Sequence, residues 1–268
     1  MYTDRQRVQK AFAAYVKNYD AEDEKIRLKI VHTYHVAELC EKIARSLHLC
    51  EEDVDLAWLL GMLHDIGRFE QLRRYGTFSD EESIDHALFG AALLFGDTWL
   101  IGDYLDAERN PNFKKEKGAG ELMLIQTAIE SHSAYRLKSD LDERTRMFCD
   151  ILRDADKIDI LRVNVEVPLE AIYNTTTWEL KNAEVSSEVM EAFREEHAVL
   201  RVLKKTPVDH VVGHMALVFE LVYPVSVRLV ERQGYLDKLM RFSSDCEQTQ
   251  KQFAILTAHM EDYMKRIS

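Results

Sequence analysis

The stretch VDLAWLLGMLHDIGR, residues 54–68, decides the fold of this chain. From Val54 to Ile66 it is apolar on nearly every face, which is typical of a helix buried on all sides. We expect this helix to carry His64 and Asp65 near its end and Gly67 as its C-cap. An ionised aspartate there is costly unless its charge is compensated. A bound metal ion would compensate it, whereas a helix end that faces solvent is the ordinary alternative.

The composition predicts helices in the rest of the chain as well. The 268 residues include only 10 glycines and 4 prolines, about five per cent where roughly twelve per cent is usual. Turns are therefore too few for a β-sandwich or barrel, and we predict an all-α protein. Apolar spacing predicts further helices over residues 4–19, 25–47, 80–95, 119–133, 141–162, 186–203, 207–233 and 244–267. Residues 163–180 are irregular enough for short extended structure, and we interpret the polar residues 108–118 as a loop that could act as a flap.

The net charge and the cysteines indicate which classes of partner and which cellular compartment to expect. The formal net charge of −12 argues against a nucleic-acid polymer or an anionic membrane as partner, but not against a small phosphorylated substrate. The four cysteines, at positions 40, 50, 149 and 246, form no C-x-x-C pair, which suits a reducing compartment. No signal peptide or membrane span is visible, so we expect a cytoplasmic protein.

Several histidines and acids accompany the His64-Asp65 doublet, each on its own predicted helix: His35, His86, His132 and Asp156. Taken singly, each has an ordinary interpretation as a core or surface residue. His32 competes with His35, and Asp154 competes with Asp156. The pair His210 and His214 has a spacing that can bind metal, but the surrounding valines indicate core packing.

The order His, His-Asp, His, His, Asp resembles the HD-domain superfamily of metal-dependent phosphohydrolases. The resemblance covers about residues 25–165 and extends more loosely beyond them. It implies an HD-like helical bundle with a helical C-terminal extension. We therefore expect one domain over residues 1–268, with a core at about 25–165 and residues 166–268 packed on it.

The resemblance also implies a ligand set. It matches His35, His64, Asp65 and Asp156 to the core metal ligands, and His86 and His132 to the extra histidines of members with a second metal. Asp65 would then bridge two ions. Asp156 is preferred over Asp154 because the ligand in the family is typically the aspartate that precedes a basic residue, here Lys157. Mixed imidazole and carboxylate ligands suit one or two ions of Fe, Mn, Ni, Co or Zn.

The implied activity is hydrolysis of a phosphoester or phosphoanhydride in a small phosphorylated metabolite, with a nucleotide favoured. A hydroxide activated by the metal ions that Asp65 bridges would attack the substrate's phosphorus. Arg68 and Lys157 would neutralise the charge on the phosphoryl oxygens. Salt bridges to nearby acids are the ordinary alternative for both cations.

Two other functions stay open, a mixed-valence diiron oxygenase with the same ligands and a non-catalytic nucleotide-sensing protein. The Ile66-Gly67-Arg68 run and the lack of Gly-Tyr-Pro disfavour long alarmones and cyclic dinucleotides as substrates. A homodimer is one option for the oligomeric state.

Overall fold

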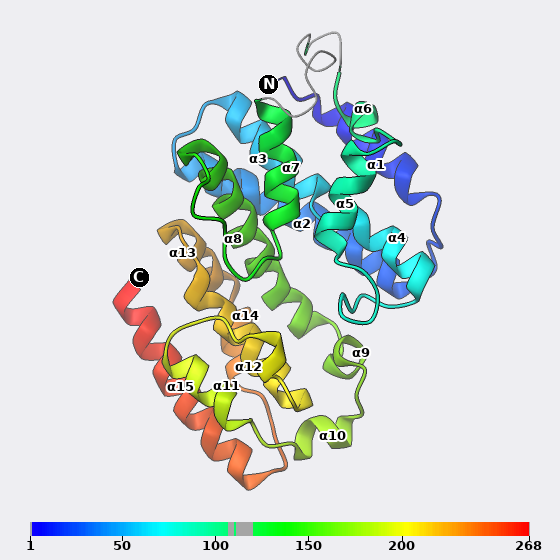
Figure 1. The fold of residues 1–268 in the computed structure, drawn as a ribbon. Coiled ribbons are helices and arrows are strands. Elements are labelled where there is room, and N and C mark those ends of the chain that lie inside the picture. The colour runs from blue at the N-terminus through cyan, green and yellow to red at the C-terminus, as the bar shows by residue number, and fades with distance from the viewer. Residues whose placement is uncertain (1, 107–109, 111–119, 268) are drawn as a thin grey trace. The chain divides into compact units, whose positions relative to one another are not determined.

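The computed structural model describes residues 2–106, 110 and 120–267. Every regular element in these ranges is a helix, which confirms the all-α prediction (Figure 1). The chain divides into two compact units, residues 1–156 and 157–268. The single-domain arrangement therefore stays a prediction, and the proposed flap at 108–118 lies outside the described residues except for Asn110.

The first unit contains α1 to α7 and the start of α8, and its centre is the pair α2 and α3. The bounds are α1 (Arg5–Val16), α2 (Glu24–Ser46), α3 (Glu51–Leu63), α4 (Ile66–Tyr75), α5 (His86–Phe95), α6 (Ile101–Tyr104), α7 (Glu121–Ser131) and α8 (Glu143–Glu166). Helix α2 packs along α3, α4 packs on α5, and α5 packs on α7. Because α3 is apolar on every face, its residues from Leu56 to Leu63 are all buried.

Two glycines let these helices approach closely. A Cβ atom at Gly61 would lie 2.4 Å from the Ala37 Cα atom of α2, so α3 needs a glycine at this contact. A Cβ atom at Gly67 would lie 2.3 Å from the His86 carbonyl oxygen. The prediction of Gly67 as a C-cap was wrong, because α3 ends at Leu63 and Gly67 lies inside α4, where it allows contact with α5.

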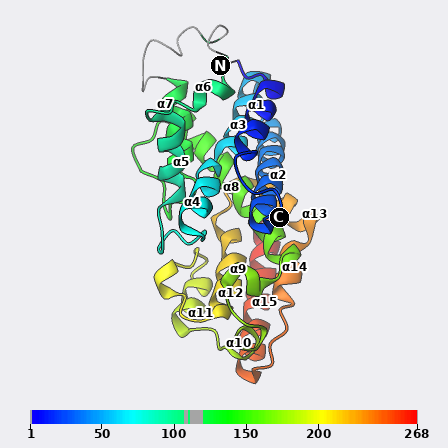
Figure 2. The same cartoon turned by 90° about the vertical axis from the view of Figure 1, so that its right-hand side faces the viewer.

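The second unit contains the end of α8 and the shorter helices that follow it. The bounds are α9 (Leu169–Tyr173), α10 (Thr177–Asn182), α11 (Ser187–Arg194), η2 (Arg201–Leu203), α12 (Pro207–Met215), η3 (Ala216–Glu220), α13 (Pro224–Gln233), α14 (Tyr235–Met240) and α15 (Glu247–Ile267). Helix α15 packs against α11, α13 and α14, and it is the long red helix of Figure 1 and Figure 2.

The second unit contains shorter and more numerous helices than the sequence pattern predicts. The expected helix 207–233 consists of three helices, and Pro224 begins the last of them, α13, where its missing N–H removes no intrahelical hydrogen bond. The expected helix 186–203 is α11 followed, after a break, by η2. Residues 163–180, where we expected irregular structure, are mostly helical.

Among the residues that the structure describes, no helix is both long and apolar enough to cross a membrane.

Candidate metal centre

Histidine and aspartate side chains from several elements of the first unit converge on one buried cluster. Its members are His32 of α2, His64 and Asp65 of the α3–α4 turn, His86 of α5, His132 at the end of α7, and Asp156 of α8. They form two groups whose ligand atoms lie within 4.8 Å of one another, His32 with His64 and Asp65, and Asp65 with His86 and His132. Asp65 belongs to both groups. Asp156 adjoins the first, since its Oδ1 atom lies 3.1 Å from His32 Nε2.

The structure places His32 in the cluster where we predicted His35. The Nε2 atom of His32 lies 3.3 Å from His64 Nε2, and His32 is only 2% exposed. His35 is half-buried and belongs to neither group. His32 and His35 are three residues apart on α2, which separates them by about 60° around the helix axis and about 4.5 Å along it. Their side chains therefore leave α2 in different directions. The other predicted ligands (His64, Asp65, His86, His132 and Asp156) do come together.

His64 and His132 are oriented by the same device, a hydrogen bond at a helix end. Each is the C-cap residue of its helix. The Nδ1 atom of His64 lies 2.8 Å from the Gly61 carbonyl oxygen, and that of His132 lies 2.7 Å from the Ile129 carbonyl oxygen. Because a carbonyl only accepts, both Nδ1 atoms carry the proton, and in the neutral rings each Nε2 atom presents a lone pair to the cluster.

Arg153 of α8 holds the end of α7 in place. Its buried guanidinium donates to the carbonyl oxygens of Ser131, His132 and Ala134 at 2.9, 3.1 and 2.5 Å. These carbonyls follow the last turn of α7, where backbone acceptors have no partner within the helix. Arg153 therefore fixes the backbone that carries His132. The sequence analysis did not identify it, because its partners are backbone atoms.

His86 is oriented by a carboxylate instead. Its Nδ1 atom lies 2.8 Å from Asp80 Oδ2, so Nδ1 donates and Nε2 is again the free acceptor. Burial and the nearby Arg68 lower the pKa of His86 to about 4, which keeps the ring neutral at pH 7. Asp80 was not predicted to take part, since an acid six residues before a histidine is no recognised signal.

The donor set fits a divalent transition metal. His86 Nε2 and His132 Nε2 lie 3.0 Å apart, and neither atom carries a hydrogen to donate to the other. Asp65 faces the same lone pairs, with Oδ1 3.6 Å from His86 Nε2 and Oδ2 3.5 Å from His64 Nε2. Such a convergence of acceptors repels itself unless a cation lies among them. Imidazole with carboxylate is a ligand set that Fe, Mn, Co, Ni and Zn accept.

Asp65 remains ionised although it is only 3% exposed. It begins α4 as the N-cap residue, yet its carboxylate makes no capping bond and is left for the cluster. Burial opposes ionisation of Asp65, whereas the Lys29 ammonium, 2.6 Å from Oδ2, favours it, and the pKa of Asp65 lies well below its ordinary value. The sequence analysis missed Lys29 as well.

A family model for the HD domain matches residues 30–164, about half of the chain, and this range contains every member of the cluster. The chain belongs to the HD-domain family. The searches of curated proteins and of solved structures returned no match. The HD domain is typical of metal-dependent phosphohydrolases, and the cluster is compatible with a divalent metal site.

The two predicted catalytic cations of the HD domain have different environments. Arg68 Nη1 donates to Gln71 Oε1, the Phe78 carbonyl oxygen and Asp80 Oδ1 at 2.9, 2.6 and 2.8 Å. Arg68 therefore does form a salt bridge with a nearby acid, Asp80. Its Nε atom also lies 3.7 Å from Asp65 Oδ1. Lys157 is buried and begins the second unit, so its role at the site stays a prediction.

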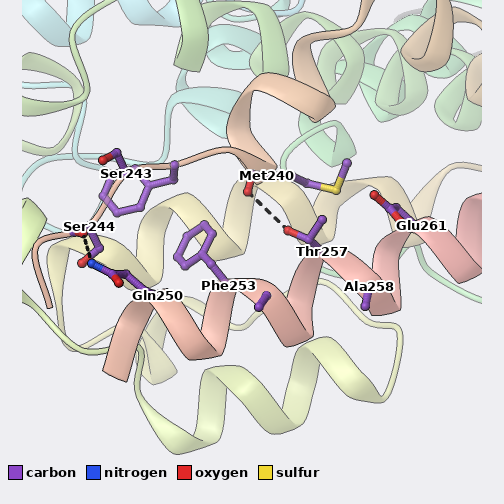
Figure 3. Close-up of a pocket in the computed structure, with 10 residues that line it drawn as sticks. Met240, Ser243, Ser244, Gln250, Phe253, Thr257, Ala258 and Glu261 are labelled. Atoms are coloured by element: carbon purple, nitrogen blue, oxygen red, sulfur yellow. Dashed lines mark hydrogen bonds between the residues drawn. The ribbon is translucent and has the colours of Figure 1, made fainter. Parts of the chain in front are cut away.

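A hollow that is not part of the HD domain lies in the second unit. It encloses about 520 Å³ beside α15, between Met240 and Glu261 (Figure 3). Its polar side chains bond locally, as when Thr257 Oγ1 donates to the Met240 carbonyl oxygen. Among the described residues that line it, Glu261 is the one ionisable group and no histidine is present. This hollow therefore lacks the grouped histidines and carboxylates of the candidate metal centre.

Proposed function

We propose that this HD-domain protein is a metal-dependent phosphohydrolase that acts on a small phosphorylated metabolite, with nucleotides as the first substrate class to test. One observation carries the proposal. Asp65 offers one oxygen to each of two groups of histidines, and the Nε2 atoms of these groups converge as acceptors. The histidines and Asp65 would hold a divalent metal, which would polarise a phosphoryl oxygen and lower the pKa of a bound water molecule.

The chain's own residues prepare this chemistry. Backbone carbonyls and Asp80 keep the imidazoles in the tautomer that coordinates through Nε2. Burial of the cluster limits competition by bulk water and strengthens electrostatic attraction. Arg68 adds a positive charge beside Asp65 that an anionic substrate can use, and Lys157 is proposed as a second such cation. A partner as large as a nucleic-acid polymer is not part of the proposal.

The test starts with metal analysis of the protein as purified. Apo protein from chelator treatment is then reconstituted with Mn²⁺, Fe²⁺, Co²⁺, Ni²⁺ or Zn²⁺ and assayed for phosphate release from nucleotides, sugar phosphates and p-nitrophenyl phosphate. We expect release that needs metal and is abolished by His64→Ala. The same substitution at the exposed His197 serves as the control and leaves activity unchanged.

Two outcomes would replace the proposal. Protein with two irons that consumes oxygen and releases no phosphate would be an oxygenase. Protein that binds nucleotides tightly in the presence of metal, yet hydrolyses none of the substrates, would be a sensor.

A further inference from the structure

Two cations flank Asp65, one beside each carboxylate oxygen. Lys29 Nζ lies 2.6 Å from Oδ2, and Arg68 Nε lies 3.7 Å from Oδ1. The same two oxygens face different histidines: Oδ2 lies 3.6 and 3.5 Å from the Nε2 atoms of His32 and His64, and Oδ1 lies 3.6 and 3.8 Å from those of His86 and His132. Each half of the metal cluster therefore has its own cation, Lys29 on the His32 side and Arg68 on the His86 side.

The two cations differ in how firmly they are held. Arg68 is fixed by the three acceptors described above, one of which also orients His86. In the described part of the chain, Asp65 is the one hydrogen-bond and ion-pair partner of Lys29, whose ammonium otherwise lies 5.5 Å from the centre of the Phe78 ring. Its side chain is 18% exposed, whereas that of Asp65 is 3% exposed, so Lys29 lies at the edge of the buried cluster.

These differences suit Arg68 to positioning its neighbours and Lys29 to binding a ligand. The Arg68 guanidinium is anchored by the three acceptors of Nη1, although its Nε atom makes no hydrogen bond, whereas an ammonium on a flexible stem can change partner. Asp65 is shared by both ligand groups, so a cation bound to its carboxylate weakens the hold of that carboxylate on Lys29. The ammonium is then a positive side chain that an incoming anion can recruit on the His32 side.

We propose that Lys29 binds an anionic oxygen of the substrate's phosphoryl group on the His32 side of the cluster, while Arg68 adds positive charge on the His86 side and positions His86 through Asp80. The identity of the anion rests on the proposed function. The placement of the cation rests on the contacts of Lys29 alone.

The test compares Lys29→Met with Lys25→Met, which removes the same charge from an exposed position one turn earlier on α2. Binding of inorganic phosphate to the Mn²⁺-loaded protein is measured by calorimetry, and Mn²⁺ affinity is measured separately. We expect Lys29→Met to weaken phosphate binding about tenfold or more, the range of a lost charge-assisted hydrogen bond. Its Mn²⁺ affinity should be unchanged or higher, because a competing cation is gone. Lys25→Met should match the wild type, and Lys29→Arg should recover most of the phosphate affinity.

With a hydrolysed substrate in hand, Lys29→Met should raise KM by the same factor and change kcat less. Unchanged phosphate affinity in Lys29→Met or Lys29→Gln would overturn the proposal. So would weaker Mn²⁺ binding in both variants, because Lys29 would then only support the ligands. The failure of hydrolysis is a separate result. If the wild-type protein releases no phosphate from any substrate, the proposed phosphohydrolase activity is refuted. The assignment of Lys29 as an anion-binding residue still holds if phosphate affinity depends on Lys29.

Discussion

Each unit of the chain buries an aspartate, and the two have opposite surroundings. Asp209 of the second unit is fully buried and accepts bonds from Ser186 N, Ser186 Oγ, Lys205 N and Thr206 N at 2.6–3.0 Å. Asp65 of the first unit has Lys29 as its close donor and otherwise faces histidine nitrogens that act as acceptors. A buried carboxylate that is satisfied by neighbouring donors supports the fold, whereas one that faces lone pairs calls for a cation.

The histidines of the two units show the same contrast. In the second unit Tyr173 stacks on His210 and His214, with ring centres 5.2 and 5.6 Å apart. The Tyr173 hydroxyl donates to Asn164 Oδ1 at 2.6 Å and accepts from His214 Nδ1 at 2.8 Å. This chain of bonds pairs its donors with acceptors. Clustered histidines therefore indicate a metal centre only where carboxylates and other lone pairs meet them.

The largest effect should come from exchanging the two aspartates for asparagine. Asp65→Asn removes a ligand charge shared by both histidine groups, so we expect loss of bound metal and a fall in kcat/KM of about 10³-fold. Asp209→Asn presents an amide to backbone donors and should instead lower the free energy of unfolding by about 3 kcal/mol. Metal analysis, kinetics and denaturant unfolding measure the two effects. Equal metal loss in both variants would erase the contrast.

The next largest effect separates two helical glycines. Gly61 meets the backbone of α2, which cannot move aside, whereas a Cβ at Gly213 would meet the flexible end of Lys204, 2.5 Å away at Cε. We expect Gly61→Ala to cost about 3 kcal/mol through overpacking. Gly213→Ala should lie between neutral and about 1 kcal/mol stabilising, because alanine favours helix. Denaturant unfolding of both variants measures this difference. A neutral Gly61→Ala would show that α2 and α3 can separate without cost.

The sequence predicted the helical class and most of the cluster because those features follow from local patterns. An all-apolar run that leads into His64-Asp65 indicates both burial and a buried charge, and the scarcity of glycine and proline indicates few turns. The HD-domain match confirms the resemblance that those residues suggested.

The remaining features depend on distances that no spacing encodes. His32 and His35 lie on the same helix, and the contact of His32 with His64 Nε2 decides which one enters the cluster. Asp80 and Lys29 join the site through a turn and a long side chain. The role of Gly67 depended on where α3 ends, and helix ends are the least certain part of a pattern.

A smaller effect should follow from removing the carboxylate that orients His86. Asp80→Ala takes away both the Nδ1 acceptor and the partner of Arg68. Loss of such a supporting residue typically weakens metal affinity by about 10–100-fold. Titration of apo protein with Mn²⁺ or Zn²⁺ gives the affinity, and Asp103→Ala at an exposed site is the matched control. Unchanged affinity in Asp80→Ala would mean that packing alone sets the orientation of His86.

The smallest effect concerns the second unit and its pH dependence. Burial, with Lys204 and His210 nearby, lowers the pKa of His214 well below its ordinary value. The unfolded chain therefore takes up a proton near pH 6.5 that the folded chain refuses, so stability is complete above that pH and falls below it, by at most about 1.4 kcal/mol per pH unit. His214→Asn keeps a donor toward Tyr173 and should flatten the fall between pH 7 and 5 in denaturant unfolding. An equally steep fall in His214→Asn would assign the proton to another group. His86, whose pKa is also lowered by burial, would be the first such group.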